Sequence, residues 1–375
     1  MSAQPVSVWR PTVEIDLDAL CANYRMLADA APTAEAAAAV KCDAYGLGAA
    51  PVAQALAISE HCRTFFVAYP EEGANLRAAL AEAAPTAAIY VFNGPHAETL
   101  DLFAAHRLTP ILNSLDQAKL WAAAQPHAAA GLHIDTGMNR LGAPYTDLSA
   151  IAGLKGLALD LVMSHLACSS APSHEKNARQ RAAFEKAAAF FPGVKRSLAA
   201  SSGALLPAEY HYDLTRLGIG LYGASPIDER DGRIRAVARL TAPVAQLREA
   251  KPGETVGYGA THAFAAPRRL AVVHLGYGDG FPRIGGNRAK AFLGGAACPV
   301  VGRVSMDYIA LDVTEAPNPV GLGDRAEFFG PNHLIEEAAA ACSTIPYELL
   351  TGLGGRVLRR YLWKAAPASW RAPDA

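Results

Sequence analysis

Eight short apolar runs recur between residues 36 and 222, and this repetition constrains the possible folds more than any other feature of the sequence. The runs are 36–41, 65–69, 88–92, 108–112, 131–135, 160–166, 195–200 and 212–217. Amphipathic segments separate them, and the segment 174–190 consists of strong helix formers. Strands and helices that alternate about eight times are typical of a parallel barrel surrounded by helices.

The pattern leaves one alternative open and marks a second domain. The connection SSGALLPAEYH before the eighth run is short for a full helix, so the pattern also allows a doubly wound open sheet. From about residue 235 the runs become β-like and are separated by Gly/Pro turns, until IEEAAAACSTI at 335–345. We therefore expect an α/β fold: a (β/α)₈ TIM-type barrel over 12–232, then a smaller, mainly β C-terminal domain over 233–375 together with 1–11.

Composition excludes several classes of function. The 375 residues carry 34 basic and 35 acidic side chains, so no basic excess favours nucleic acid or an anionic membrane. The N-terminus lacks an apolar signal core, and no run of about 18 apolar residues predicts a membrane span. The six cysteines are scattered without metal-ligand spacing. We expect a cytoplasmic protein with reduced thiols and no metal site.

Polar residues follow several of the predicted strands, where barrels of this type place functional groups. These residues are Lys41, the segment 135–140 ending in Arg140, His165, the pair 201–202, and Arg216. Lys41 by itself could be a surface lysine that ends a strand. The sequence that contains it, VKCDAYGLG, ends in two glycines that suit a tight passage from strand to helix.

Six blocks of sequence resemble the motifs of one family. They are VKCDAYGLG at 40–48, HIDTGMNRLG at 133–142, DLTRLGIGLYG at 213–223, VGYGATH at 256–262, GYGDGFPR at 276–283 and GRVSMD at 302–307. In this order they resemble the alanine racemases, which use pyridoxal phosphate (PLP). The resemblance implies a (β/α)₈ barrel with a C-terminal β domain, in agreement with the pattern of strands and helices.

The resemblance implies two bases, one on each face of the substrate. Lys41 would carry the cofactor covalently and then act as a base, a role that suits a desolvated amine with a lowered pKa. Tyr258 of the partner subunit would be the opposing acid/base. The functional unit would be a homodimer with shared active sites, and the substrates would be L-alanine and D-alanine.

Other residues would hold the cofactor. Tyr45, Ser202, Gly218 and Ile219 would bind the phosphate, at a turn whose backbone N–H groups suit an anion. Arg216 would face the pyridine nitrogen, with His165 supporting it. Because arginine cannot accept a proton, that nitrogen would stay unprotonated and the ring would be a weaker electron sink.

Further residues would contact the substrate. Arg140 would reach the substrate carboxylate and the phenolic oxygen of the cofactor. Met306 of the partner subunit would offer its backbone N–H to the carboxylate, with Asp307 supporting the site and Tyr277 narrowing its entrance.

Three positions depart from common family members. His133 stands where many carry a carbamylated lysine beside Arg140, so we expect His133 to be neutral and hydrogen-bonded, or separated from Arg140 by a small anion. Ser201–Ser202 replaces Asn-Ser, and TGLGGRV at 351–357 has glycine where some members place a tyrosine. These changes concern how Arg140 is held and how tightly the cofactor binds.

Three other functions are compatible with a barrel that binds PLP. A barrel-type amino-acid decarboxylase shares the architecture but should lack the VGYGATH tyrosine. A non-catalytic PLP-binding protein resembles the barrel alone, and the β domain of roughly 140 residues argues against it. A racemase for larger amino acids is a third possibility.

Overall fold

The computed structural model describes residues 9–372, which form two compact units. One unit is Leu20–Arg235. The other combines the described residues up to Ala19 with those from Ala236 onward. Residues 1–8, which we expected in the second domain, lie outside the described residues.

The unit Leu20–Arg235 contains all eight predicted strands. They are β2 (Glu35–Ala39), β3 (Thr64–Val67), β4 (Ala88–Val91), β5 (Thr109–Leu112), β6 (Ala129–His133), β7 (Ala158–Met163), β8 (Lys195–Ser197) and β9 (Leu214–Leu217). Each strand pairs in parallel with the next along the chain from β2 to β8, and β9 pairs in parallel with β2. The sheet is therefore a barrel in chain order.

The barrel is closed between β8 and β9 by a single parallel bridge from Ala200 to Arg216. The backbone supports this closure, since the Arg216 N–H donates to the Ala199 carbonyl at 2.9 Å. An open doubly wound sheet would leave β8 and β9 apart, so that alternative is wrong. The short connection SSGALLPAEYH contains only two 3₁₀ turns, η3 (Gly203–Leu205) and η4 (Ala208–Tyr210).

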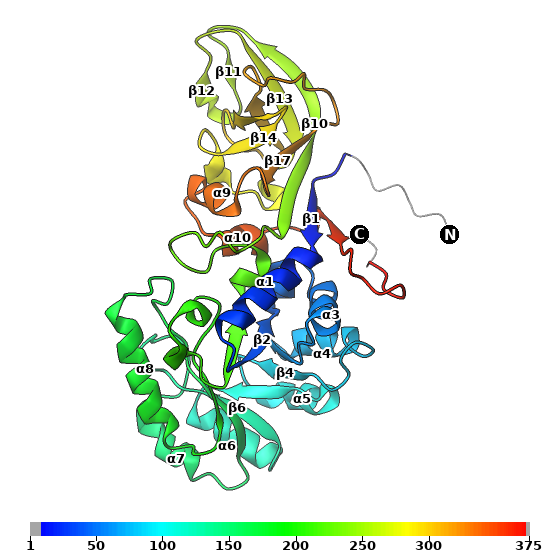
Figure 1. Cartoon of the computed structure of the whole chain (residues 1–375). Coiled ribbons are helices and arrows are strands. Elements are labelled where there is room, and N and C mark those ends of the chain that lie inside the picture. Colours follow the sequence, from blue (N-terminus) through cyan, green and yellow to red (C-terminus); the bar gives the residue numbers. More distant parts are fainter. Residues whose placement is uncertain (1–8, 373–375) are drawn as a thin grey trace. The chain divides into compact units, whose positions relative to one another are not determined.

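Helices follow the strands on the outside of the barrel (Figure 1). They are α3 (Ala49–Ser59), α4 (Pro70–Ala79), α5 (Leu100–His106), α6 (Leu115–Ala124), α7 (Leu148–Ala152) and α8 (Glu175–Ala188), and α1 (Leu17–Ala30) precedes β2. Each of the six lies within a segment with predicted helical periodicity or overlaps it. Side chains from six strands fill a buried cluster: Ala37, Ala39, Phe66, Tyr90, Ile111, Leu161, Met163 and Leu214. The barrel interior is thus a packed core, and functional groups are left to its rim.

The second unit is mainly β, as predicted. Its strands are β1 (Thr12–Asp16), β10 (Ala238–Ala250), β13 (Arg268–His274), β14 (Lys290–Leu293), β15 (Ala296–Pro299), β16 (Tyr308–Asp312), β17 (Arg325–Phe329) and β18 (Leu358–Leu362). A separate hairpin joins β11 (Thr255–Val256) to β12 (His262–Ala263). The helices are α9 (Ile335–Ala341), in the segment with helical composition, and α10 (Pro346–Thr351).

The structure corrects the predicted domain boundary of 12–232. Strand β1 belongs to the second unit, because it pairs antiparallel with β10 and parallel with β18. Its alternating burial leaves Val13 and Ile15 fully buried. The barrel unit therefore begins at Leu20 and ends at Arg235.

Candidate active site

The carboxyl ends of the barrel strands carry the predicted residues of this unit. Lys41 follows β2, Arg140 follows β6, His165 follows β7, and Gly218 follows β9. Parallel strands of a barrel end at the same rim, so these side chains share one face of the unit.

Lys41 is half-buried at the start of α2 (Lys41–Tyr45), and its Nζ lies 5.4 Å from the ring centroid of Phe92. Burial lowers the pKa of Lys41, and the guanidinium of Arg140 lowers it further, whereas the carboxylate of Glu72 raises it. A lysine with a lowered pKa is an amine suited to nucleophilic attack and to proton transfer.

The turn that follows Lys41 is left-handed. Cys42, Asp43 and Ala44 have φ between 51° and 53° and ψ between 47° and 52°, and Tyr45 has φ of 57°. A left-handed conformation costs about 1–2 kcal/mol per non-glycine residue, so four in succession need support from their surroundings. Such concentrated strain beside a lysine is characteristic of a functional site.

Arg216 is 3% exposed in β9, and all the hydrogen-bond partners found for its guanidinium are neutral. It donates to Ser197 Oγ at 2.5 Å, to the carbonyls of Ser164 and Leu198 at 2.6 and 3.4 Å, and to His165 Nδ1 at 3.5 Å. Burial lowers the pKa of Arg216 to about 9, but this value is still high enough for Arg216 to be cationic near neutrality. A buried cation held by neutral acceptors is suited to face a neutral or anionic ligand atom.

His165 and His133 are both neutral near pH 7. Burial, followed by the charge of Arg216, lowers the pKa of His165 to about 3 and that of His133 to about 4. Because Arg216 can only donate, Nδ1 of His165 must accept, and the proton of His165 therefore lies on Nε2.

His133 has the opposite tautomer. Asn113 Nδ2 donates to the carbonyls of Phe92 and Ile111 at 2.8 and 2.9 Å, which leaves Asn113 Oδ1 facing His133 Nδ1 at 3.0 Å. That oxygen can only accept, so His133 Nδ1 carries the proton. This geometry agrees with the expected neutral, hydrogen-bonded His133, and it adds Asn113, which sequence reasoning missed.

Arg140 is exposed and, within residues 9–372, its guanidinium has no hydrogen-bond or ion-pair partner. The nearby Asp135 does not hold it. Asp135 Oδ1 instead accepts from the N–H groups of Gly137 and Met138 at 2.9 Å each, and Oδ2 accepts from that of Asn139 at 3.0 Å. The guanidinium of Arg140 is therefore free to bind a carboxylate.

Gly218 and Tyr45 form a cradle at the end of β9. A Cβ atom on Gly218 would lie 2.6 Å from Tyr45 Oη, so only glycine lets the Tyr45 hydroxyl approach this turn so closely. The Gly218 N–H donates to Ser201 Oγ at 2.7 Å, and Ser202 Oγ pairs with Ser169 Oγ at 2.6 Å. Ile219 begins η5 (Ile219–Tyr222) directly after Gly218. Hydroxyls and backbone N–H groups at a glycine turn suit a phosphate.

Three of the four residues predicted in the second unit, Tyr277, Met306 and Asp307, lie around one buried carboxylate. Asp279 is 4% exposed and accepts from Gly276 N and Arg356 Nε at 2.9 Å each. Arg356 also donates to Asp307 Oδ1 at 2.8 Å. Tyr277, in η7 (Tyr277–Asp279), donates its N–H to the Ser305 carbonyl next to Met306. Asp279 and Arg356 were not predicted, although Asp279 lies inside a matched motif.

Tyr258 lies on an exposed 3₁₀ turn, η6 (Tyr258–Ala260), between Gly257 and Gly259, whose φ angles are 77° and 74°. The side chain of Tyr258 is 70% exposed, and those of Met306 and Tyr277 are 53% and 43% exposed. All three residues are therefore accessible to a second molecule.

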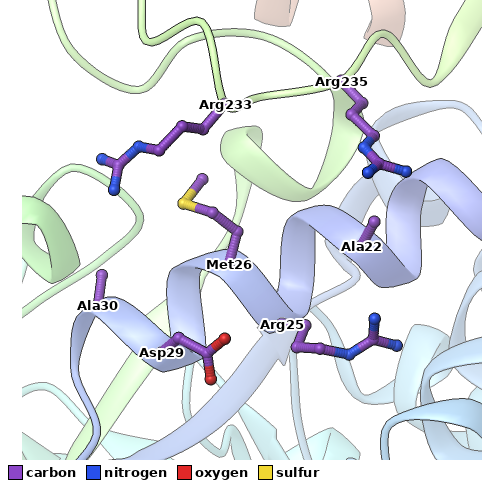
Figure 2. Close-up of a pocket in the computed structure, with 7 residues that line it drawn as sticks. All are labelled: Ala22, Arg25, Met26, Asp29, Ala30, Arg233 and Arg235. Atoms are coloured by element: carbon purple, nitrogen blue, oxygen red, sulfur yellow. The ribbon is translucent and has the colours of Figure 1, made fainter.

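A separate surface pocket of about 400 Å³ is lined by residues of α1 and by Arg233 and Arg235, and contains none of the predicted site (Figure 2). The guanidinium of Arg25 pairs with Glu60 at 2.5 Å and that of Arg233 with Asp231 at 2.6 Å. Since two of its three cations are already neutralised, we assign this pocket no part in catalysis.

No helix of the described chain is long and apolar enough to span a bilayer. Within residues 9–372, no three His, Cys, Asp or Glu side chains gather as a metal site.

The closed parallel barrel, with a lysine after its first strand and a glycine turn after its last, places the chain in the (β/α)₈ class. The alanine racemase N-terminal domain matches residues 15–226, and the alanine racemase C-terminal domain matches residues 237–361. The chain therefore belongs to the alanine racemase family.

Individual relatives agree over nearly the whole length. An alanine racemase of Methylobacterium sp. (strain 4-46) is 43% identical over 356 residues, which are 93% of this chain and 96% of the relative. One of Rhodospirillum rubrum is also 43% identical, over 92% of this chain and 94% of its own. The crystal structure of alanine racemase from Bartonella henselae, with covalently bound pyridoxal phosphate, superposes with a TM-score of 0.89 at 35% identity, covering 94% and 99% of the two chains.

Proposed function

We propose that the enzyme interconverts L-alanine and D-alanine with pyridoxal phosphate held on Lys41. Two cations at the same rim of the barrel carry the proposal. One is Lys41, which is half-buried and has a lowered pKa, and the other is Arg216, which is buried and whose observed partners are all neutral. The turn at Gly218 supports a phosphate site, because the absence of a side chain lets the Tyr45 hydroxyl reach this backbone.

Residues of the barrel unit would hold the cofactor. Tyr45, Ser202, Gly218 and Ile219 would bind its phosphate, and Arg216, oriented by His165, would face its ring nitrogen. Bound there, pyridoxal phosphate supplies a ring that stabilises negative charge on the substrate Cα when the proton leaves. Since Arg216 can only donate hydrogen bonds, it would leave the ring nitrogen unprotonated and keep that stabilisation moderate, which would limit side reactions.

Proton transfer would use one base on each face of the substrate. Lys41 Nζ would remove or return the Cα proton on one face, and Tyr258 of the partner subunit would do so on the other. The free guanidinium of Arg140 would bind the substrate carboxylate. Met306 of the partner subunit would donate its backbone N–H to that carboxylate, with Asp307 fixed by Arg356 and Tyr277 at the entrance.

The proposed unit is accordingly a homodimer, supported by the exposure of Tyr258, Tyr277 and Met306 in the second unit. We also propose a cytoplasmic location. Its support is that the six cysteines are all free thiols in the structure.

Chiral analysis of product tests the function directly. Purified enzyme incubated with L-alanine should form D-alanine until the two are equal. Lys41→Ala should abolish both the reaction and the bound cofactor, because no other amine replaces Nζ at the end of β2. Lys155→Ala, at an exposed lysine, is the matched control and should retain full activity.

Two outcomes would contradict the proposal. Release of carbon dioxide with an amine product would indicate a decarboxylase. Retention of cofactor without any turnover of alanine would indicate a non-catalytic binding protein.

A further inference from the structure

The left-handed turn after Lys41 is held by a carboxylate from a different element. Glu72 Oε1 accepts from the Cys42 N–H at 2.7 Å. Glu72 Oε2 accepts from the N–H groups of Ala68 and Tyr69 at 2.7 and 3.3 Å. Glu72 thus caps the N-terminus of α4 with one oxygen and holds the residue after Lys41 with the other.

This contact occurs where the parallel ladder of the barrel stops. The Val40 N–H still donates to the Phe66 carbonyl of β3 at 2.9 Å. At Cys42 the partner of the N–H is the Glu72 carboxylate in place of a strand carbonyl. Within the turn, Ala44 N donates to the Val40 carbonyl and Gly46 N to the Cys42 carbonyl, both at 2.8 Å. The Glu72 contact therefore fixes the first amide of a conformation that non-glycine residues disfavour.

The same carboxylate acts on the charge of Lys41. Burial and Arg140 both lower the pKa of the Lys41 amine, whereas Glu72 and the Cys42 thiol raise it. Lys41 in turn lowers the pKa of the half-buried His165. The nearby Asp43 is occupied elsewhere, since its Oδ1 accepts from Ala49 N at 2.7 Å. Glu72 is thus the carboxylate that offsets Arg140 at this amine.

We propose that Glu72 is a positioning residue for Lys41: its carboxylate fixes the direction in which the chain leaves β2 and counters the charge of Arg140 at the lysine amine. The inference rests on the proposed function only in that Lys41 is the reactive lysine. Glu72 itself touches neither substrate nor cofactor in this account.

The test compares Glu72→Gln with Glu71→Gln in the full-length chain. The glutamine side chain in Glu72→Gln keeps the size of the original and one oxygen for the α4 cap, but it loses the charge and the second acceptor. Glu71 lies in the same first turn of α4 and is exposed, so its substitution changes net charge equally without touching the turn. Amide hydrogen exchange of a peptide containing Cys42 reports the hydrogen bond from the Cys42 N–H to Glu72. Acylation of Lys41 as a function of pH, in protein freed of cofactor, reports its pKa.

In Glu72→Gln we expect exchange at Cys42 to become at least about tenfold faster, the effect of losing a charge-assisted hydrogen bond. The pKa of Lys41 should fall by about half a unit or more, because an anion that favours the ammonium form is gone. Glu71→Gln should match the unsubstituted protein in both measurements. If either Cys42 exchange or the Lys41 pKa is the same in the two variants, the proposal is wrong.

Glu72→Asp keeps the charge and serves if Glu72→Gln does not fold. The shorter side chain should retain the pKa of Lys41 but release the Cys42 amide, and unchanged exchange would overturn the proposal. Neither readout uses racemisation. A failure here therefore leaves Lys41 as the proposed cofactor lysine, whereas D-alanine formation by Lys41→Ala would remove that role of Lys41 and would leave both readouts in the unsubstituted chain unchanged.

Discussion

Two histidines, the buried His133 and the half-buried His165, avoid a repulsion between like charges. Three cationic side chains lie at the carboxyl ends of the barrel strands: Lys41, Arg140 and Arg216. A charged imidazole among them would be repelled. His165 and His133 remain neutral, each with its tautomer set by a neighbour: Arg216 for one and Asn113 for the other. His133 therefore lies near Arg216 and Arg140 without adding charge.

This arrangement makes stability depend on pH. The unfolded imidazole of His133 binds a proton near pH 6.5, whereas the folded one does so only at about 4. Between these values the unfolded state binds more protons, so the free energy of unfolding falls as pH is lowered. His165, with a folded pKa of about 3, acts in the same direction.

Thermal melts at about pH 7 and about pH 5 measure this effect. His133→Asn should lose less stability on acidification than the unsubstituted protein, because one neutral buried imidazole is gone. The control His127→Asn removes an exposed histidine at a positive φ that asparagine tolerates, and its pH dependence should be unchanged. An equal loss in both variants would show that His133 titrates normally.

Sequence motifs could name the charged residues of the site but not the polar residues that orient them. Lys41, Arg140 and Arg216 stand in distinctive blocks at strand ends. Asn113 is an ordinary loop residue outside every matched block, and its role depends on which strands of the barrel are neighbours. That information is absent from any local pattern.

At the scale of elements, the turn Lys41–Tyr45 shows the limit of local propensity. The residues KCDAY carry no glycine before Gly46, so propensity alone would favour a right-handed helix. The structure holds them left-handed through contacts with Glu72 and the end of β2. Tertiary contacts decide the hand of this turn, which is why the sequence could not predict it.

The cradle after β9 gives a prediction at the same scale. Gly218→Ala should lower affinity for pyridoxal phosphate at least about tenfold, because its Cβ would enter the space beside Tyr45 Oη. Equilibrium dialysis with spectroscopic detection of bound cofactor measures the change. Gly232→Ala is the matched control, since no atom lies within 4 Å of its added Cβ and its φ is not positive. Unchanged affinity in Gly218→Ala would remove this turn from the phosphate site.

The barrel strands themselves were predictable because strands buried on both faces appear as continuous apolar runs. All eight were found, with ends shifted by a few residues. The apolar runs by themselves did not distinguish a closed barrel from an open sheet, since closure depends on the bridge between Ala200 and Arg216. The alternating segment TVEID indicates a strand but not its sheet, which explains why β1 was placed in the wrong unit.

At the scale of the whole molecule, the two units carry complementary halves of the proposed chemistry. The barrel holds Lys41, Arg216 and the phosphate cradle. The second unit presents Tyr258, Tyr277 and Met306 on exposed turns. If each site combines one half from each chain, neither half is sufficient by itself, and the dimer is the catalytic unit.

Mixing two inactive variants tests this central claim most directly. Lys41→Ala should be inactive, and Tyr258→Phe should be slower by on the order of 10²–10⁴ while still binding cofactor. In a mixed dimer, one site has both substitutions and the other has neither. With free subunit exchange, half of the dimers are mixed, so equal amounts should recover about one quarter of the unsubstituted activity. Activity no greater than the sum of the two parents, with exchange confirmed by co-purification of differently tagged chains, would contradict a shared active site.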